Sequence, residues 1–256
     1  MAMNNDTLLQ KIIPILVAPR FPENIGSVAR VCANMGLGSM RLVAPQRLWP
    51  DPMQRLATHA GVPWLESLTT YDTLGEALHG CLLAVGTSAR VGKERGFLAN
   101  PRQAAPHILG AAQQGMAAIV FGPEDTGLTT QDLDLCSLTI TIPTSNASSL
   151  NLSQAVMVLA YELRLQALEK QDPAPLKVTP APLEEQLALR EHLQEAFAAI
   201  KVINRENPEH FMRPYKLSLE RATLTSREVR AWRGLARKIL WLNRQLKRNA
   251  LDQGKS

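Results

Sequence analysis

The sequence has few cysteines, few aromatic residues and no long hydrophobic run. Its three cysteines, Cys32, Cys81 and Cys136, lie far apart and lack metal-site spacing, so we expect buried thiols in a reducing compartment. No run of about 18 apolar residues occurs, and we therefore expect no transmembrane helix. The polar residues 1–10 lack the apolar core of a secretory signal, which predicts a cytoplasmic protein.

Charge is unevenly distributed along the 256 residues, whose net charge is +5. Residues 1–170 hold 12 Lys or Arg and 13 Asp or Glu, a net charge of −1. Residues 171–256 hold 16 Lys or Arg and 10 Asp or Glu, a net charge of +6. The basic tail indicates contact with a polyanion, although a solvated basic helix would have the same composition.

Short apolar runs alternate with helical patterns over residues 12–165. The expected strands are residues 12–17, 40–43, 81–86, 117–121 and 137–142. The expected helices are residues 24–36, with Asn24 near the N-cap, then 53–60, 70–79, 101–114 and 152–170. Nearly continuous apolar strands alternating with helices predict an α/β fold, with a mostly parallel sheet and helices on both faces.

The chain beyond residue 170 has a different character. Four prolines between residues 171 and 182 predict an extended linker. We therefore expect a domain over 1–170, a Pro-rich linker over 171–183 and a basic helical extension over 184–256. In the extension, one amphipathic helix runs through Leu189 to Ile203, and residues 207–214 interrupt the pattern. Thr225-Ser226-Arg227-Glu228 fits a capping box that begins another helix.

Four polar loops follow expected strands, at Arg20–Arg30, Thr87–Arg90, Gly122–Leu128 and Pro143–Asn151. The carboxyl ends of parallel strands meet at one edge of a sheet, where ligands bind, so these loops form the candidate site. The last loop has six hydroxyl or amide side chains in residues 144–151, more than one helix cap requires. Walker A and Gly-x-Gly-x-x-Gly sequences are absent, and the five histidines lie outside the loops, which argues against nucleotide hydrolysis, dinucleotide binding and histidine acid–base chemistry.

Three of these loops carry ordered motifs. The motifs are Asn24-Ile25-Gly26-x-x-x-Arg30, then Phe121-Gly122-x-Glu124-x-x-Gly127-Leu128, then Ile142-Pro143 followed by Ser148-Ser149-Leu150-Asn151-Leu152-Ser153. In this order they resemble the motifs of the SPOUT RNA methyltransferases, and more narrowly those of the TrmH-like ribose 2′-O-methyltransferases. The linker and helical tail are similar to the TrmJ branch of that family, which methylates tRNA.

The resemblance implies a SPOUT methyltransferase domain over residues 1–170 with a C-terminal trefoil knot, in which loop 143–151 and the following helix are threaded. It also implies a homodimer whose active site is completed across the interface. The cofactor would be S-adenosylmethionine, and no metal would be needed. The implied cofactor contacts are Thr87, Ser88, Ala89, Gly122, Ile142, Ser148, Ser149 and Leu150.

The resemblance assigns catalysis to Arg30. Since a guanidinium is effectively always protonated, we expect it to bind the substrate phosphate and stabilise the 2′-oxyanion rather than act as a base. Asn24, Ser149 and Asn151 would orient the arginine and the ribose, and Glu124 would fix the loop or pair with a basic group. Where many relatives have Gly, this chain has Glu23, and Arg20 would offset that acid.

Simpler interpretations compete with these roles. Asn24 could only cap its helix, Arg30 could be solvated or paired, and Glu124 and Asp125 could cap a turn. Ser148 and Ser149 could be ordinary loop hydroxyls. The four tryptophans are expected to pack rather than to stack on bases. The hypothesis is 2′-O-methylation of tRNA at a pyrimidine at the start of the anticodon loop. Alternatives are the same chemistry on rRNA and a catalytically silent RNA-binding SPOUT protein.

Overall fold

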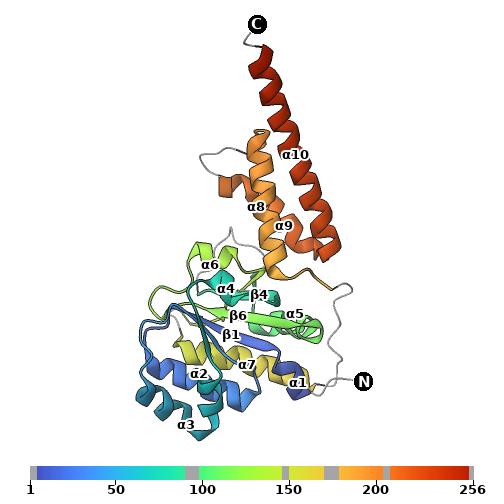
Figure 1. Ribbon diagram of the computed structural model, residues 1–256. Coiled ribbons are helices and arrows are strands. Elements are labelled where there is room, and N and C mark those ends of the chain that lie inside the picture. Colours follow the sequence, from blue (N-terminus) through green and yellow to red (C-terminus); the bar gives the residue numbers. More distant parts are fainter. Residues whose placement is uncertain (1–4, 90–97, 146–149, 170–178, 204–207, 254–256) are drawn as a thin grey trace. The chain divides into compact units, whose positions relative to one another are not determined.

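The computed structural model describes residues 5–89, 98–145, 150–169, 179–203 and 208–253. The chain divides into two compact units, Met1–Lys177 and Val178–Ser256, which Figure 1 shows as an α/β part and a helical part. In the part of the chain that the structure describes, each helix is too short or too polar to cross a membrane.

Unit 1 is built on a sheet whose described strands all pair in parallel, as expected from the apolar runs. The order is β3-β2-β1-β6-β4-β7-β5. The strands are β1 (Ile12–Val17), β2 (Arg41–Val43), β3 (Thr69–Tyr71), β4 (Cys81–Thr87), β5 (Leu98–Ala99), β6 (Met116–Phe121) and β7 (Leu138–Ile140). The helices are α1 (Asn5–Leu9), α2 (Pro22–Met35), α3 (Pro50–Glu66), α4 (Leu74–Ala77), α5 (Pro101–Gln114), α6 (Thr130–Asp134) and α7 (Leu152–Leu168). The prediction of an α/β fold with a parallel sheet is therefore confirmed.

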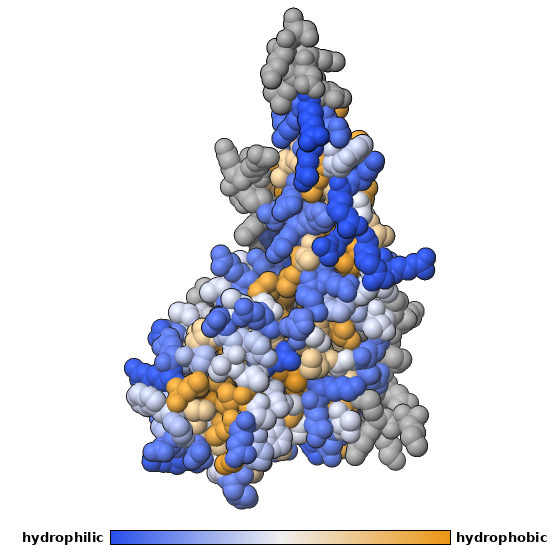
Figure 2. Space-filling view, viewed as in Figure 1, coloured by the Kyte–Doolittle hydropathy of each residue, from blue (hydrophilic) through white to orange (hydrophobic). Residues whose placement is uncertain are grey.

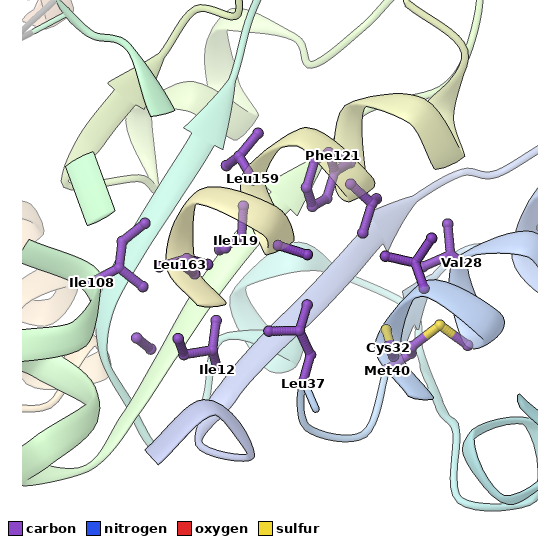
Figure 3. Close-up of a cluster of buried hydrophobic side chains, with 14 of the residues drawn as sticks. Ile12, Val28, Cys32, Leu37, Met40, Ile108, Ile119, Phe121, Leu159 and Leu163 are labelled. Carbon is purple, nitrogen blue, oxygen red and sulfur yellow. The ribbon is translucent and has the colours of Figure 1, made fainter. Parts of the chain in front are cut away.

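The core of unit 1 lies between the central strands and three helices. Figure 3 shows Ile12 of β1 and Ile119 and Phe121 of β6 meeting Leu159 and Leu163 of α7. Side chains of α2 and α5 complete the cluster, and each buried aliphatic or aromatic group there contributes roughly 1.5–3 kcal/mol. All three cysteines are buried and free, and burial raises the pKa of the Cys32 thiol to about 12.

Helix α2 begins two residues earlier than expected. Pro22 occupies the first turn, and Phe21 is the N-cap, with no hydrogen bond from its side chain. Asn24 therefore lies inside the first turn, so the alternative that it caps the helix is wrong. The expected end of the helix is confirmed, because Gly36 adopts the left-handed conformation with φ 76°.

Two further expectations for unit 1 are wrong. Residues 70–79 are not one helix, because Thr69–Tyr71 pairs with β2 as an edge strand and the short helix α4 begins only after Thr73. β-Branched and aromatic side chains favour this strand. The helix expected at 53–60 is α3, which extends over Pro50–Glu66 and is kinked at Thr58, where φ is 54°.

Helices α2 and α3 pack with almost no space between their backbones. A Cβ atom on Gly26 would overlap the carbonyl oxygen of Met53, and a Cβ atom on Gly61 would lie 2.9 Å from the backbone nitrogen of Arg30. Only glycine permits this approach. The contact fixes where α2, which carries Asn24 and Arg30, lies against α3.

Unit 2 contains α8 (Leu183–Ala199), α9 (Pro208–Ala222) and α10 (Ser226–Gln253). They share a small core that includes Leu189, Leu193 and Val229. The expected interruption at 207–214 is wrong, since α9 begins at Pro208 and continues through Pro214. Proline is common at the first position of a helix, so Pro208 is compatible with a helix start. The sequence pattern alone does not distinguish such a start from a break between helices.

The capping box at the start of α10 is confirmed. The Glu228 amide donates to Thr225 Oγ1 at 3.3 Å, and the Thr225 amide donates to Glu228 Oε2 at 2.8 Å. The Thr225 amide and the Thr225 hydroxyl both donate to the Glu228 carboxylate and lower its pKa, the backbone hydrogen bond being the larger cause.

We predict that replacing Gly26 with Ala destabilises the protein by about 1–3 kcal/mol, because the added methyl group overpacks the contact between two backbones. The matched control is Gly75→Ala in α4, where nothing lies within 4 Å of an added Cβ. Urea unfolding followed by circular dichroism measures both variants. Equal stability of the two would contradict the close approach of α2 and α3.

We predict a pH-dependent effect of Glu228→Gln, which removes the charge and keeps the length of the side chain. A depressed pKa contributes stability that is present above the unfolded value of about 4.3 and is lost as pH falls through the folded pKa. The variant should therefore have a lower urea midpoint than the wild type at pH 7, and the difference should narrow below about pH 4. Glu191→Gln, at an exposed position of α8, is the control. A difference in urea midpoint that is the same at pH 7 and below about pH 4 would contradict a stabilising role of the Glu228 charge in the capping box.

Candidate functional site

A cavity of about 240 Å³ opens in unit 1 where the chain leaves β4, β6 and β7. Of the residues expected to contact a cofactor, Thr87, Ser88, Ala89, Gly122, Ile142 and Leu150 line it. Ser148 and Ser149 lie outside the residues that the structure describes. The three loops are far apart in sequence, and the parallel sheet brings them to one edge, as expected.

The loop after β6 can take its shape only with glycine at residue 122. A Cβ atom there would overlap the backbone of Gly127 and Leu128. Gly127 has φ 68°, and its amide donates to the Pro123 carbonyl at 2.9 Å, which closes the turn. Backbone groups therefore line this side of the cavity at close range.

Three side chains, from the first turn of α2 and from the loops after β6 and β7, form one hydrogen-bonded chain beside the cavity. Asn151 Nδ2 donates to Asn24 Oδ1 at 3.0 Å, and Asn24 Nδ2 donates to Glu124 Oε1 at 2.6 Å. Asn24 is buried, so both halves of its amide need such partners. The structure thus brings together three of the five residues that were expected to act in catalysis.

Asn151 also caps the helix that follows it. The Asn151 Oδ1 accepts from the Ser153 backbone amide at 2.9 Å, and the Asn151 backbone amide donates to Gln154 Oε1 at 3.2 Å. Helix capping and a link to Asn24 are therefore both functions of this one side chain. The positive end of the α7 helix dipole therefore lies where the Asn151 cap meets Asn24.

Glu124 is held by amide groups. Besides Asn24, the Arg20 backbone amide donates to Glu124 Oε2 at 3.2 Å. The Arg20 guanidinium instead pairs with Asp125, with Nη1 and Oδ2 separated by 2.6 Å and both side chains 43% exposed. The expectation that Arg20 would offset Glu23 is therefore replaced by a bond between the loops after β1 and β6. Of the two roles considered for Glu124, its contacts match the fixing of loop geometry.

Arg30 lies apart from this cluster. Its side chain is exposed on α2, it does not line the cavity, and it forms no hydrogen bond or ion pair with any other residue that the structure describes. The alternative that Arg30 is paired with a nearby acid therefore finds no support among the described residues. With respect to the described residues, its guanidinium is left available to a group from outside this subunit.

Sequence reasoning missed part of the cavity lining. Besides the expected residues, the lining includes Phe121, Pro123, Asp125, Thr126, Leu128, Ile140, Thr144, Leu152 and Ala155. A signal for several of them was present, because they belong to the same loops and flank the motif residues. Among the described residues, no group of three His, Cys, Asp or Glu is placed to hold a metal ion.

Comparison with known proteins gives concordant results. Residues 11–161 match the model of the SpoU rRNA Methylase family. The chain is 37% identical over 239 residues to a protein of Cronobacter sakazakii named tRNA (cytidine/uridine-2'-O-)-methyltransferase TrmJ, with 91% of this chain and 97% of the relative covered.

Two solved structures also match this chain. TrmJ from Z. mobilis ZM4 matches with a TM-score of 0.73 and 33% identity, over 89% of this chain and 98% of that one. A structure described as "Structural insights into the 2-OH methylation of C/U34 on tRNA" matches with a TM-score of 0.50 and 28% identity, over 62% of this chain and 97% of that one.

We predict that Asn24→Leu destabilises the protein by about 1–3 kcal/mol, because it removes the buried amide that gives one hydrogen bond to Glu124 and accepts one from Asn151. Ser27→Ala on the same helix is the control. Its hydroxyl donates only to the Glu23 carbonyl of its own helix, so the change should stay within about 0.5 kcal/mol. Urea unfolding measures both variants, and an Asn24→Leu protein as stable as the control would show that the chain of hydrogen bonds contributes nothing.

Proposed function

Because the chain belongs to the SpoU rRNA methylase family, we propose that it transfers the methyl group of S-adenosylmethionine to the 2′-hydroxyl of a tRNA nucleotide. The observation that carries the proposal is the convergence of three loops, each with a motif residue at the cavity or in the adjoining hydrogen-bonded chain. The names of the relatives supply the substrate, since they describe cytidine or uridine methylation in tRNA. The proposed target is a pyrimidine ribose of the anticodon loop, in cytoplasmic tRNA.

The cavity has a chemical character that suits the cofactor. Apolar side chains of Ile140, Ile142 and Leu150 line one part of it, as a purine ring requires. Hydroxyl groups of Thr87 and Thr126 and the closely approaching backbone at Gly122 offer hydrogen bonds for polar groups. When bound, S-adenosylmethionine supplies an electrophilic methyl group, and these residues would hold and orient it.

The residues of this chain then have distinct tasks. Glu124, Asn24 and Asn151 hold the three loops in register, so that the cavity and the start of α2 keep a fixed geometry. Arg30 would bind a phosphate of the RNA and stabilise negative charge on the attacking 2′-oxygen. The proton would leave through the phosphate or through water, since arginine remains protonated. Ser149 would orient the ribose, as the family resemblance implies.

The proposal includes a second copy of the chain. Arg30 is exposed and does not line the cavity of its own subunit, which is what a site completed by two subunits requires.

The proposal also includes a trefoil knot around residues 143–151. The sheet order supports it, because β7 lies between β4 and β5, and the chain after residue 140 leaves the sheet between two earlier strands.

Unit 2 would guide the RNA. Exposed basic side chains run along the length of α10: Arg227, Arg230, Arg237, Lys238, Arg244, Lys247 and Arg248. A surface of this kind attracts phosphates, and binding should weaken steeply with salt.

Methylation of rRNA is the second candidate, because the matching family is named for rRNA. Transfer of labelled methyl groups to tRNA and rRNA transcripts separates the two. Labelling confined to rRNA would overturn the tRNA proposal, and absence of S-adenosylmethionine binding in calorimetry would overturn the enzyme. Mass-spectrometric mapping of nucleosides in tRNA from cells lacking the protein identifies the position.

We predict that Arg30→Ala lowers kcat for tRNA methylation by roughly 10²–10³-fold, the cost of removing one stabiliser of an oxyanion. Calorimetric binding of S-adenosylmethionine should stay unchanged, since Arg30 does not line the cavity. Arg30→Lys keeps the charge without the planar fork and should recover part of the rate. Full activity of the alanine variant would exclude Arg30 from the mechanism.

A further inference from the structure

Unit 1 exposes a tryptophan and a phenylalanine at the starts of two neighbouring helices. Trp49 is 54% exposed and directly precedes Pro50 of α3, and Phe21 is 51% exposed and directly precedes Pro22 of α2. The guanidinium of Arg47 lies over the Trp49 ring, 5.2 Å from its centroid. The surface over α2 and α3 mixes hydrophobic and hydrophilic areas (Figure 2).

The fold itself gives no reason for the exposed ring of Trp49. Its side chain makes no capping hydrogen bond, and its backbone is extended, with φ −89° and ψ 116°. Trp64, near the other end of α3, is a contrast, because it is partly buried and its indole nitrogen donates to the Leu37 carbonyl at 2.9 Å. Trp64 packs, as tryptophans were expected to do, whereas Trp49 presents its ring to solvent. An exposed aromatic stacked with arginine is typical of a binding surface.

Hydrogen bonds place this surface next to the candidate site. The Ala18 amide donates to the Val43 carbonyl at 2.8 Å, and the Gln46 amide donates to the Pro19 carbonyl at 3.2 Å. The loop that carries Arg47 and Trp49 is therefore bound to the loop before α2. That second loop continues into Arg20, whose amide holds Glu124. The exposed ring and the Glu124–Asn24–Asn151 chain thus belong to one bonded loop assembly.

The charge of this segment suits RNA. Residues 18–60 contain five arginines and two acids, and Arg30, Arg47 and Arg55 are exposed. Aromatic and arginine side chains are also common in protein interfaces, so the pair alone does not identify the partner. Single-stranded RNA loops are recognised by stacking on aromatic rings and arginine planes, and their phosphates attract the excess of arginines in this segment. That excess charge, beside the candidate site, favours an unpaired base of RNA over a second protein surface.

We propose that Arg47 and Trp49 form a stacking platform for an unpaired base of the substrate RNA that flanks the methylated nucleotide. The proposal rests on the proposed function, because it assigns a substrate contact to that reaction. Arg47 holds the indole ring and contacts the neighbouring phosphate, and the ring covers one face of the base.

The test compares three variants of the full chain: Trp49→Ala, Trp49→Phe and the control Leu48→Ala, whose side chain is 42% exposed but has no ring. Loss of one base–aromatic stack should raise the KM for an anticodon stem-loop RNA on the order of tenfold in Trp49→Ala, with kcat and S-adenosylmethionine affinity unchanged. The KM of Trp49→Phe should return most of the way to the wild-type value, and the KM of Leu48→Ala should match the wild type. Stem-loops that carry an abasic ribose on either side of the target are measured in parallel.

The abasic RNA makes the test specific. If Trp49 stacks on a flanking base, removing that base should raise the KM of the wild type and leave Trp49→Ala unaffected, because the two changes remove the same contact. Additive effects, or an unchanged KM in Trp49→Ala, would overturn the platform. Dissociation of a dimer by both Trp49→Ala and Leu48→Ala in light scattering would also overturn it and assign the surface to a second copy. A wild-type protein that fails to methylate any RNA would instead overturn the proposed function.

Discussion

The site depends on one buried amide. Asn24 accepts from Asn151 and donates to Glu124, so a single side chain joins the loops that follow β1, β6 and β7. Its partners are 100 and 127 residues away in the sequence, and no local interaction could hold them. A buried amide that lost either partner would bear an unpaired polar group, and this cost keeps the three loops in one arrangement. The cavity and the position of α2 follow from that arrangement.

Close backbone contacts make the arrangement rigid on either side of Asn24. Gly26 allows α2 to meet the carbonyl of Met53 in α3, and Gly122 lets the loop after β6 turn back on Gly127 and Leu128. Packed backbones cannot adjust as side chains do, so small displacements of α3 would reach Asn24 and Arg30. The same rigidity serves catalysis, since a transferring group and its acceptor must be held within a fraction of an ångström.

Strong periodic patterns predicted most of the fold. The helix at Pro101–Gln114 has the expected bounds, and β1 and the capping box at Thr225 are where the apolar run and the Thr-x-x-Glu spacing placed them. The errors fall where local signals are weak or ambiguous. Strand β3 has three residues and depends on pairing with β2, and a helix opened by Pro208 has the same composition as a break.

The sequence by itself determined which loops form the candidate site, because polar residue types at fixed spacing follow the apolar strands, whose carboxyl ends meet at one edge of the sheet. Only the tertiary structure decided what each residue does. Asn24, expected to orient the arginine and the ribose, is the centre of a hydrogen-bonded chain, and Arg20 pairs with Asp125 across two loops. Trp49, expected to pack, presents its ring to solvent beside that assembly. The physical reason is that hydrogen bonds and exposure depend on neighbours distant in sequence, which only the packed parallel sheet brings together.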